Sequence, residues 1–116
     1  MNSIFSAAIF DGYFKEGVEL FNSNKFYKAH IVWETIWKDG NIEDRGKIKG
    51  YIQLTGAIIN YLRGKKESSD YLFSKSIKNI SANNFKKIIN QDKLINEIKL
   101  FYTTNDISIV QCEILL

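Results

Sequence analysis

The sequence predicts an all-α protein, a single-domain antiparallel bundle of about five helices, and three observations predict it. Apolar residues recur at intervals of three and four positions, which is the period of an amphipathic helix. The chain contains no proline, so no predicted helix is interrupted by one. Its 116 residues suffice for one continuous hydrophobic core. We therefore treat residues 1–116 as one helical domain.

Two apolar stripes predict the first two helices. The first stripe is Phe10, Phe14, Val18 and Phe21, and the second is Phe26, Ala29, Trp33 and Trp37. The polar residues 22–25 between them form a short connection, which favours two antiparallel neighbours. Gly40 is expected to end the second helix, and Asn41 is expected to cap a third.

The third helix is predicted to be the longest, from Ile42 to Arg63, and to end at Gly64. Its predicted apolar stripe is Ile48, Ile52, Thr55, Ile59 and Leu62. A second stripe is polar and consists of Lys49, Gln53, Gly56, Asn60 and Arg63. Glycines at 46, 50 and 56 lower helix propensity by about 1 kcal/mol each, which predicts that a neighbour packs close to this helix.

The C-terminal part, residues 81–116, is less regular. A fourth helix before it is predicted from Leu72, Phe73, Ser76, Ile77 and Ile80, and a last helical region is predicted from Phe85, Ile88, Ile89, Leu94, Ile95, Ile98 and Phe101. The tail from Ile107 to Leu116 is hydrophobic and β-prone. An edge strand, a packed helix and a partner-binding segment all remain open for it. No internal repeat is evident.

Composition argues against several functions. The net charge of +3 comes from 14 dispersed lysines and two arginines, with no arginine cluster along a groove, so we expect no nucleic-acid binding. The apolar runs are shorter than the roughly 20 residues that span a bilayer, so we expect no membrane insertion. One cysteine and one histidine are too few for a disulfide or a zinc finger. We expect a cytoplasmic protein without a metal or cofactor.

The segment KAHIVWETIW, residues 28–37, contains the candidate site. His30 and Glu34 lie four positions apart and therefore share one helix face. That spacing allows a hydrogen bond, joint metal ligation or a proton-transfer pair. The metalloprotease motif H-E-x-x-H is absent because Ile31 follows the histidine. A buried polar network and a functional pair both remain open as interpretations.

The third helix is expected to supply the opposite wall of this site. Gln53 and Asn60 lie two turns apart with Gly56 between them, which leaves bare backbone beside a ligand. The candidate catalytic residues are His30 as acid or base and Glu34 as the group that orients it, because histidine changes charge near neutral pH. The candidate ligand-binding residues are Trp33, Trp37, Gln53, Asn60 and Arg63.

Two segments resemble a known family. LFNSNKFYKAHIVWETIW (20–37) and GYIQLTGAIINYLRG (50–64) are similar to the domain-of-unknown-function family 309 in motif order and spacing. The resemblance covers at most residues 14–80 and implies an all-α bundle in which the His-Glu helix packs on the G-x-I-Q helix, with no established activity. The matched residues are Phe21, Asn22, His30, Glu34, Trp37, Gly50, Ile52, Gln53, Ala57, Arg63 and Gly64.

This chain departs from the family pattern at two positions. The family pattern has glutamate directly after the histidine, where this chain has Ile31, and histidine where this chain has Asn60. Each difference removes a potential metal ligand or proton carrier. We therefore expect a polar His/Glu site between the second and third helices, for a small ligand or a metal. The alternative is a structural or interaction module that forms a homo-oligomer or holds a partner, which the hydrophobic tail motivates.

Overall fold

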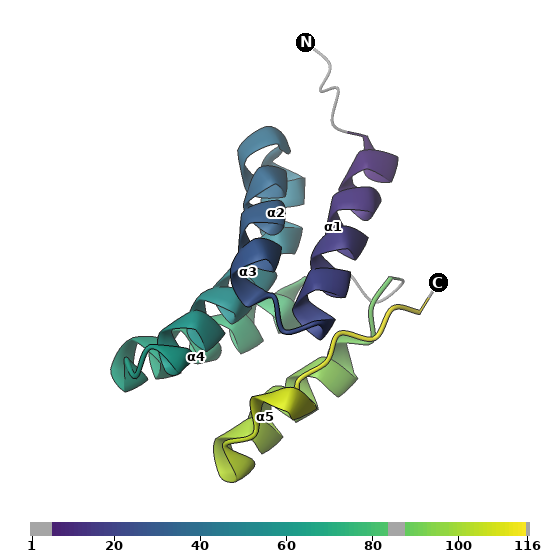
Figure 1. Ribbon diagram of the computed structural model, residues 1–116. Helices are drawn as coiled ribbons and strands as arrows, with labels where there is room; N and C mark the ends of the chain where they lie inside the picture. Colours follow the sequence, from purple (N-terminus) through teal and green to yellow (C-terminus); the bar gives the residue numbers. More distant parts are fainter. Residues whose placement is uncertain (1–5, 84–87, 116) are drawn as a thin grey trace.

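The computed structural model describes residues 6–83 and 88–115, and this part of the chain is all helical apart from its connections and tail. The elements are α1 (Ala7–Asn22), α2 (Phe26–Asp39), α3 (Ile42–Leu62), α4 (Lys66–Ala82), α5 (Gln91–Thr104) and the 3₁₀ turn η1 (Ile107–Ile109). Figure 1 shows α1 and α2 side by side, with α4 and α5 crossing the lower half of the molecule. None of these described helices is long and apolar enough to cross a membrane.

The first two helices confirm most of the predicted apolar pattern. The whole first stripe is buried, as are Phe26, Ala29 and Trp33 of the second. Trp37 is the exception, because its side chain is 41% exposed and Ile36 is buried in its place. At the end of α2 the guanidinium of Arg45 lies 5.7 Å from the centre of the Trp37 ring, so this indole packs under a surface cation.

The predicted start of α3 is confirmed. The side chain of Asn41 accepts a hydrogen bond from the Asp44 amide at 2.9 Å, and the Asp44 carboxylate accepts one from the Asn41 amide at 3.0 Å. This reciprocal pair satisfies two amides that a helix start leaves without partners. Arg63 caps the other end, one residue after the last residue of α3.

The predicted apolar stripe of α3 is only partly right. Ile48 and Thr55 are buried, Ile52 and Ile59 are half-buried, and Leu62 is exposed. Most of the buried surface belongs to other residues: Gly50, Tyr51, Leu54, Ala57 and Ile58. The reason is that α3 packs against α2 on one side and α4 on another, so it buries two faces and one stripe cannot describe it.

Close packing at the α3 glycines is confirmed most clearly at Gly50. A Cβ atom there would lie 2.7 Å from Cγ1 and 2.8 Å from the backbone nitrogen of Ile80 on α4. The hydroxyl of Ser76 also donates to the Gly50 carbonyl at 2.7 Å. At Gly46 and Gly56 a Cβ would make only ordinary contacts, at 3.5 and 3.4 Å. Gly50 is therefore a point where α4 packs directly against the backbone of α3.

The backbone shows an internal repeat, two similar helical hairpins, that is not evident in the amino-acid sequence. Asn24 and Gly64, 40 positions apart, occupy the same place in the turns α1–α2 and α3–α4, with positive φ angles of 63° and 75°. The amide of the following lysine, Lys25 or Lys65, donates to the carbonyl five positions earlier, at 2.9 Å in both turns. Two helical hairpins of the same design therefore follow one another, while their side chains differ enough to hide the repeat.

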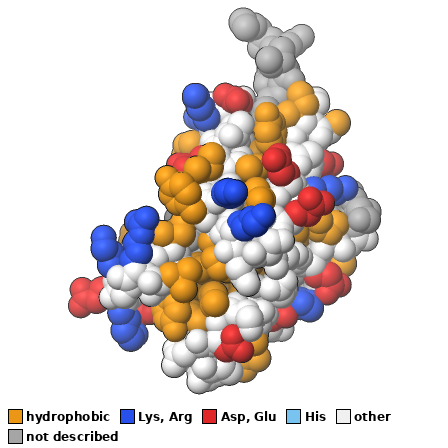
Figure 2. All heavy atoms as spheres, in the orientation of Figure 1, with side chains coloured by type: hydrophobic (Ala, Val, Ile, Leu, Met, Phe, Trp, Pro, Cys, Tyr) orange, Lys and Arg blue, Asp and Glu red, His pale blue; other side chains and the backbone are white. Residues whose placement is uncertain are grey.

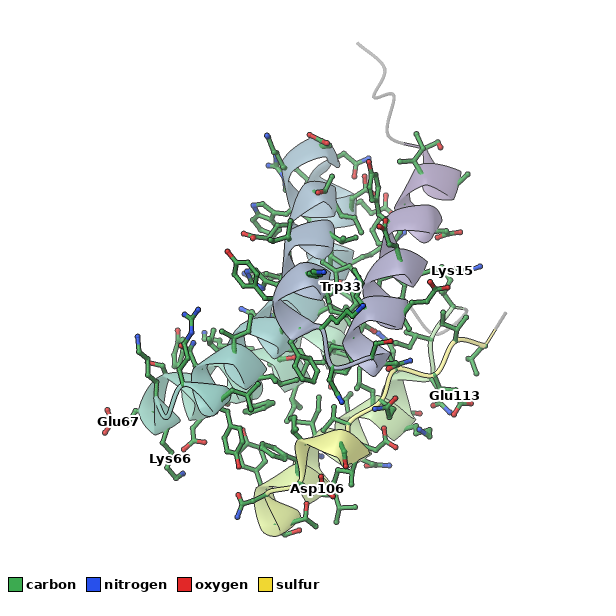
Figure 3. The ribbon with its side chains drawn as sticks, viewed as in Figure 1. Lys15, Trp33, Lys66, Glu67, Asp106 and Glu113 are labelled. Atoms are coloured by element: carbon green, nitrogen blue, oxygen red, sulfur yellow. The ribbon has the colours of Figure 1, made fainter. Side chains whose placement is uncertain are left out.

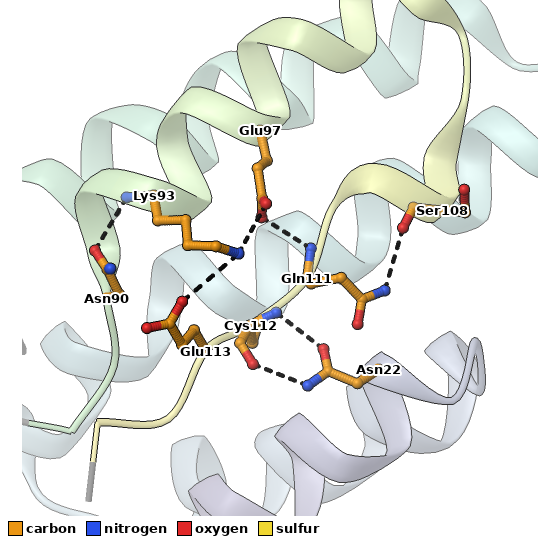
Figure 4. A network of polar contacts seen from close by, with 8 residues as sticks. All are labelled: Asn22, Asn90, Lys93, Glu97, Ser108, Gln111, Cys112 and Glu113. Atoms are coloured by element: carbon orange, nitrogen blue, oxygen red, sulfur yellow. Dashed lines mark hydrogen bonds and ion pairs between the residues drawn. The ribbon is translucent and has the colours of Figure 1, made fainter.

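The tail is extended and packs on its own chain. Val110 and Cys112 are buried, and an isolated antiparallel bridge pairs Ile114 with Ile89. The side-chain amide of Asn22 donates to the carbonyl of Cys112 at 2.8 Å and accepts from its amide at 2.9 Å, as Figure 4 shows. The tail thus covers the end of α1.

The last helix begins later than predicted. Ile88 and Ile89 are buried but lie in the extended segment before α5, which starts at Gln91. The predicted Phe85 lies outside the described residues. Lys93 on α5 forms an ion pair of 2.8 Å with Glu97, whose carboxylate also accepts from the amide of Gln111 in the tail at 3.2 Å (Figure 4). Polar contacts therefore hold the tail against α5 as well as α1.

Candidate functional site

The candidate site begins with a chain of polar groups between α2 and α3. Nδ1 of His30 lies 2.7 Å from the hydroxyl of Thr55, and Nε2 lies 3.3 Å from a carboxylate oxygen of Glu34. The histidine side chain is 22% exposed, whereas that of Glu34 is 56% exposed. His30 therefore connects a buried hydroxyl to a carboxylate at the surface.

Two hydrogen-bond arrangements of His30 and Thr55 fit the observed contacts. In both of them the ring nitrogen that faces Glu34, Nε2, carries a proton. The Thr55 hydroxyl lies 2.8 Å from the carbonyl of Ile52. If it donates there, it accepts from Nδ1–H, and a charged ring then presents Nε2–H to Glu34. If it donates to Nδ1 instead, a neutral ring also carries its proton on Nε2. The remaining tautomer would set a lone pair against the carboxylate, so the observed contacts disfavour it.

Sequence reasoning missed the role of Thr55. It placed this residue in the apolar stripe of α3, where the structure does bury it completely. A buried hydroxyl needs a hydrogen-bond partner. His30, the one histidine of the chain, has ring nitrogens that can form such a bond. The polar residue within an apolar stripe was therefore the signal that could have found it.

A small groove opens beside the Glu34 carboxylate. It has a volume of about 170 Å³ and is lined by Glu34 and Trp37 from α2 and by Lys49, Ile52 and Gln53 from α3. Lys49, which the sequence placed in a polar stripe, thus borders the site. Three of the predicted site residues therefore share one groove, with His30 directly behind Glu34.

Gln53 is held in the groove by α4. It is half-buried, and its side-chain carbonyl accepts a hydrogen bond of 2.7 Å from the side-chain amide of Asn79. Its side-chain nitrogen has two N–H groups, which it can offer to a ligand.

Three predicted site residues lie elsewhere. Trp33 is completely buried, and its indole nitrogen donates to the carbonyl of Phe14 at 3.2 Å. Figure 3 labels Trp33 between α1 and α2. Asn60 lines a separate surface groove with residues at the start of α4, and Arg63 lines another with the start of α2. The structure brings neither of them to the groove beside Glu34.

The described residues contain no group of three or more histidine, cysteine, aspartate or glutamate side chains that could hold a metal ion. His30 and Glu34 are thus accompanied by an amide, an ammonium and an indole rather than by further metal ligands.

The fold and the site define a small all-α protein of two successive helical hairpins with a polar groove between α2 and α3. The sequence model of the family described as Domain of unknown function (DUF309) matches residues 14–72, and the chain belongs to this family. The matched range contains both candidate helices, α2 and α3. No curated protein and no solved structure matches the chain.

Proposed function

We propose that the groove between α2 and α3 binds a small ligand through a cationic group, such as a primary ammonium, with Glu34 as its anionic contact. The observation that carries this proposal is the position of Glu34. Its carboxylate is held by the His30–Thr55 chain, yet it is more than half exposed and faces a groove that also contains the Trp37 ring. A pair that served only the core would have both partners buried.

The chemistry of the other lining groups supports a cation. The face of an indole attracts an ammonium group. Gln53 and Lys49 border the same groove and suit a hydrogen-bond acceptor on the rest of the ligand. In this proposal His30 positions Glu34 and does not touch the ligand, because both of its ring nitrogens face protein groups. Acid or base catalysis by His30 stays a prediction that requires the ligand to reach Nε2.

The expected affinity is weak. A cation over an exposed aromatic ring contributes about 0.5–1 kcal/mol, and an exposed ion pair contributes up to about 1 kcal/mol. Since a dissociation constant of about 1 mM corresponds to roughly 4 kcal/mol, these contacts, which sum to about 2 kcal/mol at most, predict a dissociation constant of roughly 30 mM or weaker for a minimal ligand. The assay must therefore detect weak, saturable binding.

The test is an NMR titration of the ¹⁵N-labelled protein with butylammonium chloride, alongside butanol at the same concentrations and sodium chloride at matched ionic strength. We expect saturable shifts of the Trp37 indole and the Gln53 side-chain amide with butylammonium alone. The variant Glu34→Gln should weaken this binding several-fold. Glu43→Gln is the matched control, because Glu43 also pairs with a residue four positions along its helix but lies outside the groove.

Two results would overturn the proposal: no saturable shift up to about 500 mM butylammonium at matched ionic strength, or equal binding by the Glu34→Gln variant. We also keep a cytoplasmic location as part of this proposal, since the one cysteine is a free, buried thiol. Homo-oligomer formation is the alternative, and light scattering after size-exclusion chromatography decides it.

A further inference from the structure

A second cavity lies at the opposite end of the fold, between the start of α4 and the end of α5. It has a volume of about 360 Å³, within the usual range for small-molecule sites. Its lining comes from the end of α3, the turn at Gly64, the first turns of α4 and the end of α5. Figure 2 shows hydrophobic side chains gathered on this face, with charged side chains at its left edge.

Aromatic rings form the interior of this cavity. Phe73 and Phe101 are almost completely buried. Tyr61 packs edge-on against Phe101 with ring centres 4.8 Å apart, and Tyr102 packs edge-on against Phe73 at 5.5 Å. The rings thus hold each other in place without a ligand, so a bound apolar group meets a surface that is already organised.

The rim carries one charge of each sign. Lys66 and Asp70 lie one turn apart at the start of α4, and Nζ is 2.8 Å from a carboxylate oxygen. Lys66 is 83% exposed and Asp70 is 46% exposed. An exposed pair of this kind contributes little to stability, so exchanging it for contacts with a ligand has a small cost. Figure 3 labels Lys66 at the outer end of α4, with rings between that helix and α5.

The tyrosine at the rim stays protonated. Burial, together with the negative charge of Asp70, raises the pKa of Tyr102 to about 12. Its hydroxyl therefore remains neutral at physiological pH and can donate a hydrogen bond. The rim as a whole is then electrically neutral but strongly dipolar, which suits a zwitterion better than a simple cation or anion.

Comparison of the α1–α2 hairpin with the α3–α4 hairpin shows why this cavity is open. Lys66 follows the α3–α4 turn at the place that Phe26 occupies after the α1–α2 turn, 40 positions earlier. Phe26 is buried and packs edge-on against Phe21, with ring centres 5.1 Å apart. Tyr61 takes the place of Phe21 in the second hairpin, but Lys66 extends into solvent and leaves the adjoining space open.

The backbone at the turn keeps one wall of the cavity free. Gly64 has a φ of 75°, and a Cβ atom added to it would meet no atom within 4 Å. The first hairpin has Asn24 at this position. In the second hairpin the buried aromatic side chain is therefore replaced by an exposed lysine, and the turn residue that lines the cavity, Gly64, has no side chain.

From these observations we propose that this cavity binds a free α-amino acid with an apolar or aromatic side chain. The ammonium group pairs with Asp70, the carboxylate pairs with Lys66, and the side chain enters among the rings. This site is separate from the groove beside Glu34 and does not depend on the function proposed for it.

The test is an NMR titration with L-phenylalanine and L-leucine. Three comparison compounds each remove one element: N-acetyl-L-phenylalanine has no ammonium, L-phenylalaninamide has no carboxylate, and glycine has no side chain. We expect saturable shifts at Gly64, Asp70 and Tyr102 with the two amino acids, and affinity several-fold weaker for each comparison compound. Such shifts are distinct from those at Trp37 and Gln53, so the two proposals fail or succeed separately.

Two variants sharpen the test. Asp70→Asn should weaken binding of L-phenylalanine several-fold, and Lys66→Phe, which copies the first hairpin, should fill the cavity and abolish binding while the protein stays folded. Glu43→Gln is the control, since Glu43 is a helix-surface acid outside the cavity. Equal binding of N-acetyl-L-phenylalanine, unchanged binding by Asp70→Asn, or no saturable shift with either amino acid would overturn the proposal. Circular dichroism of each variant checks that it is folded.

Discussion

Replacing Gly17 by alanine should destabilise the protein, although alanine is the better helix former. Gly17 lies on the buried face of α1 and packs directly against the indole of Trp33. A Cβ atom at position 17 would lie 2.5 Å from Cε2 and 2.6 Å from Cδ1 of that ring, and nearer still to Nε1. The indole is completely buried, stacks on Phe14 and meets the edge of Tyr51, so moving it disturbs these contacts.

The net effect follows from three contributions. Alanine in place of glycine inside a helix gains about 1 kcal/mol. Overfilling a packed core costs about 1–3 kcal/mol. Displacing the ring also breaks the bond from its nitrogen to the Phe14 carbonyl, and a buried donor left without a partner costs about 1–3 kcal/mol. We expect Gly17→Ala to lower the free energy of unfolding by about 1–5 kcal/mol.

The matched control is Gly12→Ala in the same helix. A Cβ atom at Gly12 would meet nothing within 4 Å, so this variant should gain about 0.5–1 kcal/mol. Urea denaturation followed by tryptophan fluorescence and circular dichroism measures both variants against the unmodified protein. If Gly17→Ala is as stable as the unmodified protein, or if both variants shift in the same direction, the packing of Trp33 on α1 is not as described.

Further predictions concern the tail, alkaline pH and the polar pair. Asn22→Ala should lower the free energy of unfolding by about 2 kcal/mol, because it removes both hydrogen bonds to Cys112; a loss below about 0.5 kcal/mol in urea denaturation would mean that the tail is not held there. Burial raises the pKa of the Cys112 thiol and of the Tyr51 hydroxyl, so unfolding releases their protons once the pH exceeds their unfolded values, near 8.5 and 10. The contribution of these two groups to stability should therefore be constant below about pH 8 and fall at higher pH, by up to about 1.4 kcal/mol per pH unit for each group, and stability that rises from pH 8 to 10 would contradict this sign. In a double-mutant cycle, His30→Ala and Glu34→Ala should couple by less than about 1 kcal/mol, since Glu34 is largely exposed, whereas coupling above about 2 kcal/mol would make the pair part of the core.

The number and order of the helices followed from local sequence signals. Each hydrogen bond of a helix and each capping pair joins residues within a few positions, so Asn41 could be recognised as the start of α3 before any packing was known. The stripe from Phe10 to Phe21 was predictable for the same reason, because α1 buries a single face. Prediction was poorer for α3, which buries two faces and has weak amphipathicity.

The candidate site was predictable only where its contacts are local. His30 and Glu34 are one turn apart, and their proximity is a property of the helix itself. Asn60 and Arg63 were assigned to the same site because they continue the stripe of Gln53 along α3, but two further turns of helix carry them to grooves at the other end. A shared helix face does not imply a shared groove when the helix is long.

The sequence by itself therefore determined the all-α class, the helix boundaries near their caps, and the one-turn pair on α2. Only the tertiary structure decided that His30 meets Thr55, that Asn22 holds the tail at Cys112, and that a lysine after the second turn leaves a cavity where the first hairpin has a buried phenylalanine. The physical reason is that these contacts depend on the rotation and crossing of whole helices. Packing over the entire core sets that geometry, and no short stretch of sequence specifies it.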